Sequence, residues 1–163
     1  MPQSTHTNSI KTVQMANAIL LPEVVRLLND GHTVTLPLRG YSMRPFLEDG
    51  RDKALLRKPE AINIGDAVLA EIFPKHYVLH RIVAIDGDHV TLRGDGNLAT
   101  ESCRLADIKA TAIGFYRKGR QTLDSVDSKK WRIYSRLWTF LFPIRRYLLA
   151  FYRRIWLKLF KPI

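Results

Sequence analysis

The sequence predicts a mostly β domain between an N-terminal helix and a C-terminal amphipathic helical tail. Apolar residues recur at helical spacing near the N-terminus, short β-branched runs separated by Gly, Asp and Pro fill the middle, and the C-terminal part is basic and aromatic. A length of 163 residues suits one domain plus an appendage. The expected parts are a helical segment at 1–31, a β domain at 32–118, a linker at 119–130 and the tail at 131–163.

The composition is that of a globular chain, with an uneven charge. Hydrophobic residues make up 46% and charged residues 25%, which excludes a largely disordered chain, a collagen-like repeat and a multi-span membrane protein. Cys103 is the single cysteine, so an internal disulfide and a multi-thiolate metal site are excluded; we expect no metal and no cofactor. Residues 1–128 hold 16 Lys+Arg and 15 Asp+Glu, whereas residues 129–163 hold 10 Lys+Arg and no acid.

The N-terminal region predicts a helix rather than a secretion signal. Residues 1–9 are polar, with neither a basic start nor an apolar run. Apolar positions between 12 and 28 have helical spacing, and Asn29-Asp30-Gly31 supplies a stop. Pro22 should kink or restart this helix, because its ring clashes with the carbonyl four residues earlier.

The middle of the chain predicts several strands in a small barrel or folded sheet. Asp86-Gly87-Asp88 joins two of them, because Asp-Gly favours the positive φ angles of a tight hairpin turn. The predicted strands are 33–36, 67–73, 77–85, 89–93 and 108–116.

A serine, a histidine and an acid interrupt this strand pattern in that order. Gly40 and Pro45 surround Ser42, which predicts a tight turn that presents the serine at the start of a short helix. Backbone N–H groups in such a turn, at Ser42 and Gly40, could hold an oxyanion. His80 lies inside an apolar strand and could take the proton from Ser42. Asp95 lies in a Gly-rich turn that the hairpin could return toward His80.

Four short segments in order resemble the boxes of type I signal peptidases, whose superfamily includes the LexA-like self-cleaving proteins. They cover roughly 33–118 and are more specific together than singly. The segments are Gly40-Tyr41-Ser42-Met43-Arg44-Pro45, Gly65-Asp66-Ala67-Val68, His80-Arg81-Ile82-Val83 and Gly94-Asp95-Gly96-Asn97.

The resemblance implies a fold and a set of roles. The family fold is a coiled, mostly antiparallel sheet around an extended substrate strand. Ser42 is the implied nucleophile, and Met43 is implied to line the substrate cleft. His80 stands where bacterial and LexA-like enzymes use lysine, as in the Ser-His signal peptidases of the endoplasmic reticulum and archaea. The acid that orients His80 is Asp95, inside the matched box, or alternatively Glu101 a few residues later.

The basic aromatic tail predicts contact with an anionic membrane surface through residues 131–161. Its uncharged runs are far shorter than the ~20 residues that span a bilayer as a helix. Apolar side chains form one helical stripe, with basic residues toward another side, which suits the headgroup region. A helical hairpin docked on the domain or on a partner protein is the alternative, and nucleic acid is disfavoured by the aromatic stripe. The stripe is Ile144, Leu148, Phe151, Ile155 and Leu159.

These features together favour a membrane-associated serine endopeptidase that cleaves a leader or signal peptide. Peripheral attachment at the cytoplasmic face is favoured over the outer face, because the tail is basic and no export signal precedes it. A non-catalytic peptide-binding or regulatory module of the same fold is the first alternative. A LexA-like regulator is the second, although residues 1–33 offer no clear helix-turn-helix.

Overall fold

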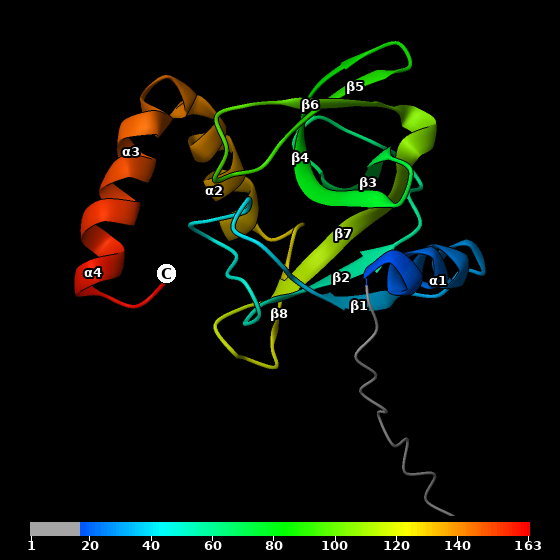
Figure 1. The fold of residues 1–163 in the computed structure, drawn as a ribbon, viewed down its shortest axis with the longest axis horizontal. Helices are drawn as coiled ribbons and strands as arrows, with labels where there is room; N and C mark the ends of the chain where they lie inside the picture. The colour runs from blue at the N-terminus through cyan, green and yellow to red at the C-terminus, as the bar shows by residue number, and fades with distance from the viewer. Residues whose placement is uncertain (1–16) are drawn as a thin grey trace, which may run out of the picture.

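The computed structural model describes residues 17–163, which form one open, antiparallel sheet with helices at both ends (Figure 1). The prediction of a mostly β domain between helices is confirmed. The strand order is β1-β2-β7-β3-β4-β5-β6, and β8 pairs with β7. The strands are β1 (Val34–Pro37), β2 (Lys53–Arg57), β3 (Ala67–Phe73), β4 (His76–Asp86), β5 (His89–Arg93), β6 (Glu101–Arg104), β7 (Ile108–Tyr116) and β8 (Leu123–Ser125).

Two apolar clusters lie on opposite faces of the central strands. Alternate side chains of a strand point to opposite faces, and in β3 four consecutive residues are buried because both faces are covered. The first cluster includes Leu69 of β3 together with residues of β2, β7 and both terminal helices. The second includes Val68 of β3 with residues of β4, β5 and β6. The middle of β3 and of β4 is therefore covered on both faces, and His80 and Arg81 of β4 are buried there.

Strand predictions agree best with the structure where β-branched or apolar residues are continuous. Strands β3 and β7 have the predicted bounds, and Gly87 has φ +55° in the predicted hairpin turn. Three short strands, β2, β6 and β8, were not predicted. Strand β8 lies inside the segment expected to be a linker, and it pairs with β7.

The N-terminal helix α1 (Asn17–Asn29) packs on the first cluster through Val24 and Leu28. Its described part begins at Asn17, and the predicted residues 12–16 lie outside the described part of the chain. Pro22 lies inside the helix rather than at its end. Gly31 has φ +87°, a backbone conformation that favours glycine, and the chain turns there toward β1.

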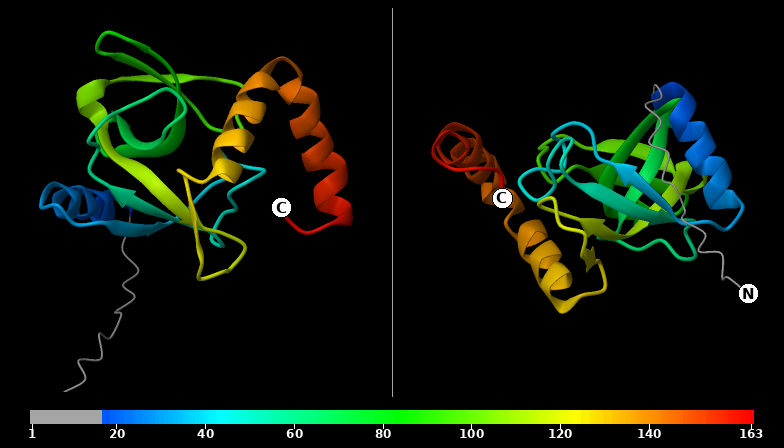
Figure 2. Two further views of the ribbon diagram at one scale, coloured as in Figure 1. Left: turned by 180° about the vertical axis from the view of Figure 1, so that it is seen from behind. Right: turned by 90° about the horizontal axis from the view of Figure 1, so that it is seen from below.

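The tail forms two helical arms beside the domain (Figures 1 and 2). The first arm, α2, begins after Ser128, whose hydroxyl accepts a hydrogen bond from the Trp131 N–H. The second arm is continuous helix with one π-helical segment, and the chain then turns back toward the domain. The elements are α2 (Lys129–Phe140), η2 (Phe142–Ile144), α3 (Arg145–Phe151), η3 (Tyr152–Trp156) and α4 (Leu157–Leu159).

The first arm belongs to the fold of the β domain. Trp131 is buried in the first cluster and stacks on Phe115 of β7, with 4.8 Å between ring centroids. Trp138 is also buried. Helix α2 is therefore docked on the β domain, as the alternative of a docked helical hairpin expected. Its apolar face is directed toward the sheet.

The outer face of the tail carries many exposed apolar side chains. Every predicted stripe residue is exposed except Leu148, which is half-buried. Across residues 17–163, no helix has the length and apolar character that crossing a bilayer requires. The exposed large apolar residues of the tail are Ile133, Leu137, Phe140, Phe142, Ile144, Tyr147, Phe151, Ile155, Leu159 and Phe160.

Candidate active site

Ser42 lies in an irregular loop between β1 and β2, not at the start of the short helix that the sequence predicted. The loop is a series of turns, with hydrogen bonds from the Arg44 N–H to Tyr41 O and from the Leu47 N–H to Met43 O. Arg44 also pairs with Glu48 through its guanidinium, and both side chains are largely buried. The serine is therefore held by a loop with its own internal polar contacts.

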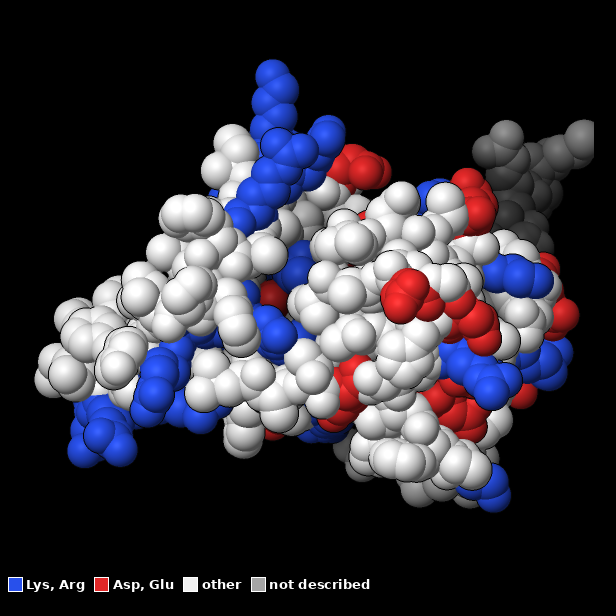
Figure 3. Space-filling model, turned by 90° about the horizontal axis from the view of Figure 1, so that it is seen from above, with Lys and Arg blue, Asp and Glu red and all other residues white. Residues whose placement is uncertain are grey.

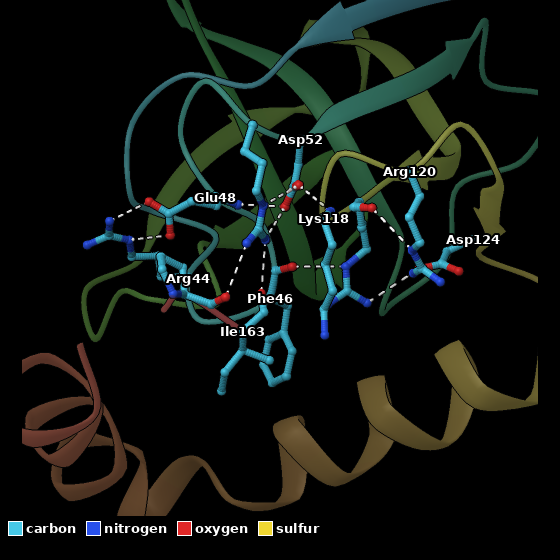
Figure 4. A network of polar contacts seen from close by, with 11 residues as sticks. Arg44, Phe46, Glu48, Asp52, Lys118, Arg120, Asp124 and Ile163 are labelled. Atoms are coloured by element: carbon cyan, nitrogen blue, oxygen red, sulfur yellow. Dashed lines mark hydrogen bonds and ion pairs between the residues drawn. The ribbon is translucent and has the colours of Figure 1, made fainter. Parts of the chain in front are cut away.

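Buried Asp52 closes this loop against the end of β7 (Figure 4). Its carboxylate accepts hydrogen bonds from the N–H groups of Glu48 (2.9 Å) and Lys118 (2.8 Å), and from the Arg51 side chain (2.8 and 2.9 Å). Burial by itself raises the pKa of a carboxyl, but these donors outweigh burial and the pKa of Asp52 is lowered. Arg51 also donates to the carbonyl of Pro162 (3.2 Å), so the chain end returns to this loop.

The loop brings Ser42 beside His80 of β4 at a glycine that follows β5. A Cβ on Gly94 would clash with the backbone oxygen of Ser42, and it would lie 3.1 Å from His80 Nε2. The Gly96 N–H donates to the same Ser42 oxygen at 2.7 Å. Only glycine permits this approach, because the Ser42 backbone oxygen and the imidazole both lie close to the point where a Cβ of residue 94 would stand.

The acid in contact with His80 is Glu101 of β6. Nδ1 of His80 lies 2.6 Å from Oε2 of Glu101, a close polar contact whose angle is not that of a hydrogen bond. The strand register explains the contact. His80 shares a face with Ile82, which pairs with Leu92 of β5, and Leu92 pairs with Glu101.

The imidazole is 3% exposed, and this burial controls its protonation. Burial lowers the pKa of His80 below its usual value of 6.5, while the nearby Glu101 carboxylate and, more weakly, Asp95 oppose the shift. The direction that prevails is downward. His80 is therefore neutral at pH 7, the form that a general base requires.

Asp95, the first choice for the orienting acid, contacts Arg81 rather than His80. Its two oxygens accept from Nε (3.0 Å) and Nη2 (2.8 Å) of Arg81, and both side chains are almost fully buried. His80 and Arg81 are neighbours on one strand, so their side chains point to opposite faces, and Asp95 lies on the Arg81 face. The acid next to the imidazole is thus the alternative, Glu101.

The Arg81–Asp95 pair anchors helix α2. Tyr134 donates to Asp95 Oδ2 (3.2 Å), and Trp138 Nε1 donates to the Asp95 carbonyl (3.0 Å). Burial disfavours the charged guanidinium, but Asp95 outweighs burial and the pKa of Arg81 is raised. Burial, with the Asp95 charge, raises the pKa of the Tyr134 hydroxyl. The Arg81 guanidinium therefore stays charged and the Tyr134 hydroxyl stays neutral throughout the physiological pH range.

Other predicted site residues have different surroundings from those expected. The Gly40 N–H donates to Asp49 at 2.8 Å, so it is engaged and not free to hold an oxyanion in this conformation. Within residues 17–163 the Ser42 N–H has no hydrogen-bond acceptor, and no hydrogen bond joins its side chain to His80. Met43, expected to line the substrate cleft, is buried in the first apolar cluster.

The residues that fix these groups in place were not predicted from the sequence. Arg81 and Tyr134 gave no local signal, because an arginine next to a strand histidine and a tyrosine in a basic helix both suit a surface. Phe46 packs on Tyr134 and Trp138, with ring centroids 3.8 and 5.1 Å apart, and so joins the serine loop to α2. The only indication available for Arg81 was its place in an apolar strand, where a buried charge needs a partner.

No protein-family model matches this chain, and comparison with curated proteins found no match. Chemically, the described residues place a hydroxyl-bearing loop, a buried imidazole and a carboxylate next to one another. General-base activation of a serine uses these three kinds of group, joined by hydrogen bonds that are not formed within residues 17–163.

We expect Asp95→Asn to lower the free energy of unfolding by about 3–5 kcal/mol, because it leaves the buried Arg81 charge without its carboxylate. Urea denaturation followed by tryptophan fluorescence measures this. Asp88→Asn is the matched control, since its pair with Arg104 is exposed and 4.0 Å long. Equal stability of the two variants would contradict the anchoring role of Asp95.

Proposed function

We propose that this protein is a serine endopeptidase of the signal-peptidase-like kind, which cleaves a leader or signal peptide at or near a membrane. Ser42 is the nucleophile, His80 the general base, and Glu101 the acid that orients the imidazole. The observation that carries the proposal is the approach of Ser42 and His80 Nε2 to the same glycine, with Glu101 at the other ring nitrogen. The coiled-sheet fold of that superfamily is part of the proposal.

The chemistry follows from the positions of these groups. A rotation of the Ser42 side chain toward Nε2 would let His80 take its proton as the hydroxyl attacks a peptide carbonyl. The Glu101 carboxylate stabilises the resulting imidazolium. The free N–H of Ser42 is the backbone donor available to the oxyanion, and His80 then returns the proton to the leaving amine. Water releases the acyl group by the reverse sequence.

A non-catalytic peptide-binding module is the second candidate. The absence of a hydrogen bond between the Ser42 hydroxyl and His80, within residues 17–163, favours it, and so does the engaged Gly40 N–H. Hydrogen bonds in catalytic sites without substrate are often long or poorly aligned, so the peptidase remains the better supported of the two.

Ser42→Ala should reduce kcat/KM for a signal-like peptide by about 10⁴-fold or more, because it removes the nucleophile. The measurement is cleavage of a fluorogenic peptide with small residues at the first and third positions before the cut. Ser102→Ala, an exposed serine on β6, is the control and should leave the rate unchanged. A wild type that binds the peptide but cleaves it no faster than Ser42→Ala would select the binding module.

The pH dependence should reflect the buried imidazole. Because burial lowers the pKa of His80, the midpoint of the acid limb of kcat/KM should lie below pH 6.5. Glu101→Gln removes a charge that raises this pKa, so the acid limb should move further downward, and the plateau rate should fall about 100-fold. Glu60→Gln, at an exposed site, should change neither. An acid limb that moves upward in Glu101→Gln would refute the assignment.

The outer face of the tail is the membrane-binding surface of the proposed peptidase. Exposed aromatic and aliphatic side chains lie there, and residues 129–163 contain ten basic residues and no acid. Figure 3 shows acidic side chains over the β domain and basic ones over the tail. Apolar burial and attraction to anionic lipid both favour peripheral binding, with the cytoplasmic leaflet as the proposed partner.

Phe151→Ser with Ile155→Ser should weaken binding to vesicles of phosphatidylglycerol and phosphatidylcholine about tenfold or more, because both side chains are exposed on the apolar stripe. Flotation of the full chain measures this. Substitutions are preferred to deletion of the tail, since deletion would also remove Trp131 from the core. Phe73→Ser is the control, a phenylalanine on β3 that is 69% exposed, against 53% for Phe151. An equal loss in the control would contradict a specific membrane surface.

A further inference from the structure

A second feature lies between the second arm of the tail and the turn after β5. A cavity of about 510 Å³ is lined on one side by Gly96, Asn97, Leu98 and Ala99, and on the other by the helical arm. This volume is in the usual range for a binding pocket. The arm contributes Arg146, Leu149, Ala150, Arg153 and Arg154.

The charged side chains that line this cavity are all positive. Three arginines line it and no Asp or Glu does. Arg153 donates to the Gly96 carbonyl at 2.7 Å and so fixes the wall. Arg146 and Arg154 are exposed and have no ion-pair partner among residues 17–163. Their guanidinium donors are available to an anion, and arginine is suited to bind a carboxylate through two parallel hydrogen bonds.

The cavity adjoins the candidate active site. The Gly96 N–H donates to the backbone oxygen of Ser42 at 2.7 Å, and the Gly96 carbonyl accepts from Arg153. One residue therefore separates the serine loop from the arginine-lined wall. A peptide placed across Ser42 would have its flanking residues at this cavity.

The orientation of the arm favours a peptide over a lipid headgroup as the ligand. Leu149, which lines the cavity, is buried, so this face of the arm is directed toward the β domain. Phe151 and Ile155 are exposed and belong to the stripe on the other side of the helix. A bilayer in contact with the stripe would lie on the side of the arm away from the arginines.

We propose that the cavity lined by Arg146, Arg153 and Arg154 is a subsite for an acidic side chain of the peptide substrate, close to the scissile bond. The inference rests on the proposed peptidase function, and it names the class of substrate: a peptide with Asp or Glu near the cut. The two unpaired arginines give specificity, and Arg153 holds the wall of the site.

Binding, measured apart from cleavage, tests this subsite. The full chain carrying Ser42→Ala is titrated into fluorescein-labelled signal-like peptides that differ by Glu or Gln at each position around the cut, and anisotropy gives the Kd. At one position the Glu peptide should bind about tenfold more tightly than its Gln partner. Adding Arg146→Gln with Arg154→Gln should abolish this preference and leave the Kd of the Gln peptide unchanged.

A matched pair of charge losses separates the subsite from general attraction to a basic tail. Lys158→Gln with Lys161→Gln removes the same charge outside the cavity and should preserve the Glu preference. Equal losses in both double variants, or no Glu preference at any position, would overturn the proposal. So would an arginine variant that loses flotation with phosphatidylglycerol vesicles while it retains the peptide preference.

The two proposals can fail separately. A Glu preference in binding without cleavage by the wild type would leave the subsite standing and refute the peptidase. Cleavage by the wild type with equal Kd values for Glu and Gln peptides would refute the subsite alone.

Discussion

The buried ion pair between Arg81 and Asp95 is the interaction on which the rest of this structure depends. It joins the central strand β4 to the turn after β5, and the same carboxylate and carbonyl hold Tyr134 and Trp138 of helix α2. Taking two charges out of water is unfavourable unless each is fully satisfied, and here three side-chain donors reach the Asp95 carboxylate and a fourth reaches its carbonyl. Since the turn also packs on Ser42, this pair fixes the position of the candidate site relative to both core clusters.

The fold could be predicted where local pattern and burial agree. Continuous apolar residues gave the correct bounds for β3, whose first four residues are buried, and alternating burial accompanies the correct bounds of β5 and β7. Strand β6, with the sequence Glu-Ser-Cys-Arg, has almost no β-type signal and exists because β5 offers it a pairing edge. The stretch around Leu123 has the same origin, since its pairing depends on β7. Sequence periodicity does not report such pairing.

The candidate site was predictable in its residue types but not in its partners. Ser42 and His80 stood out because an oxygen nucleophile and an imidazole occur in ordered boxes. The choice between Asp95 and Glu101 depended on which face of β4 each acid reaches, and that follows from the register of β4, β5 and β6. Without β6 in the predicted fold, no register argument could favour Glu101. The choice of Asp95 rested on its place inside the matched box, and that place does not report which face of β4 the acid reaches.

The composition changes near residue 129, but the packed domain does not end there. Charge and aromatic content mark the tail as a separate appendage, whereas Trp131 stacks on Phe115 and completes the apolar interior. An amphipathic helix fused to a finished domain could be exchanged or removed at little cost to that domain. Here the first arm cannot be separated from the sheet, and the outer arm, beyond Phe140, is also tied to the domain through Arg153 and the chain end.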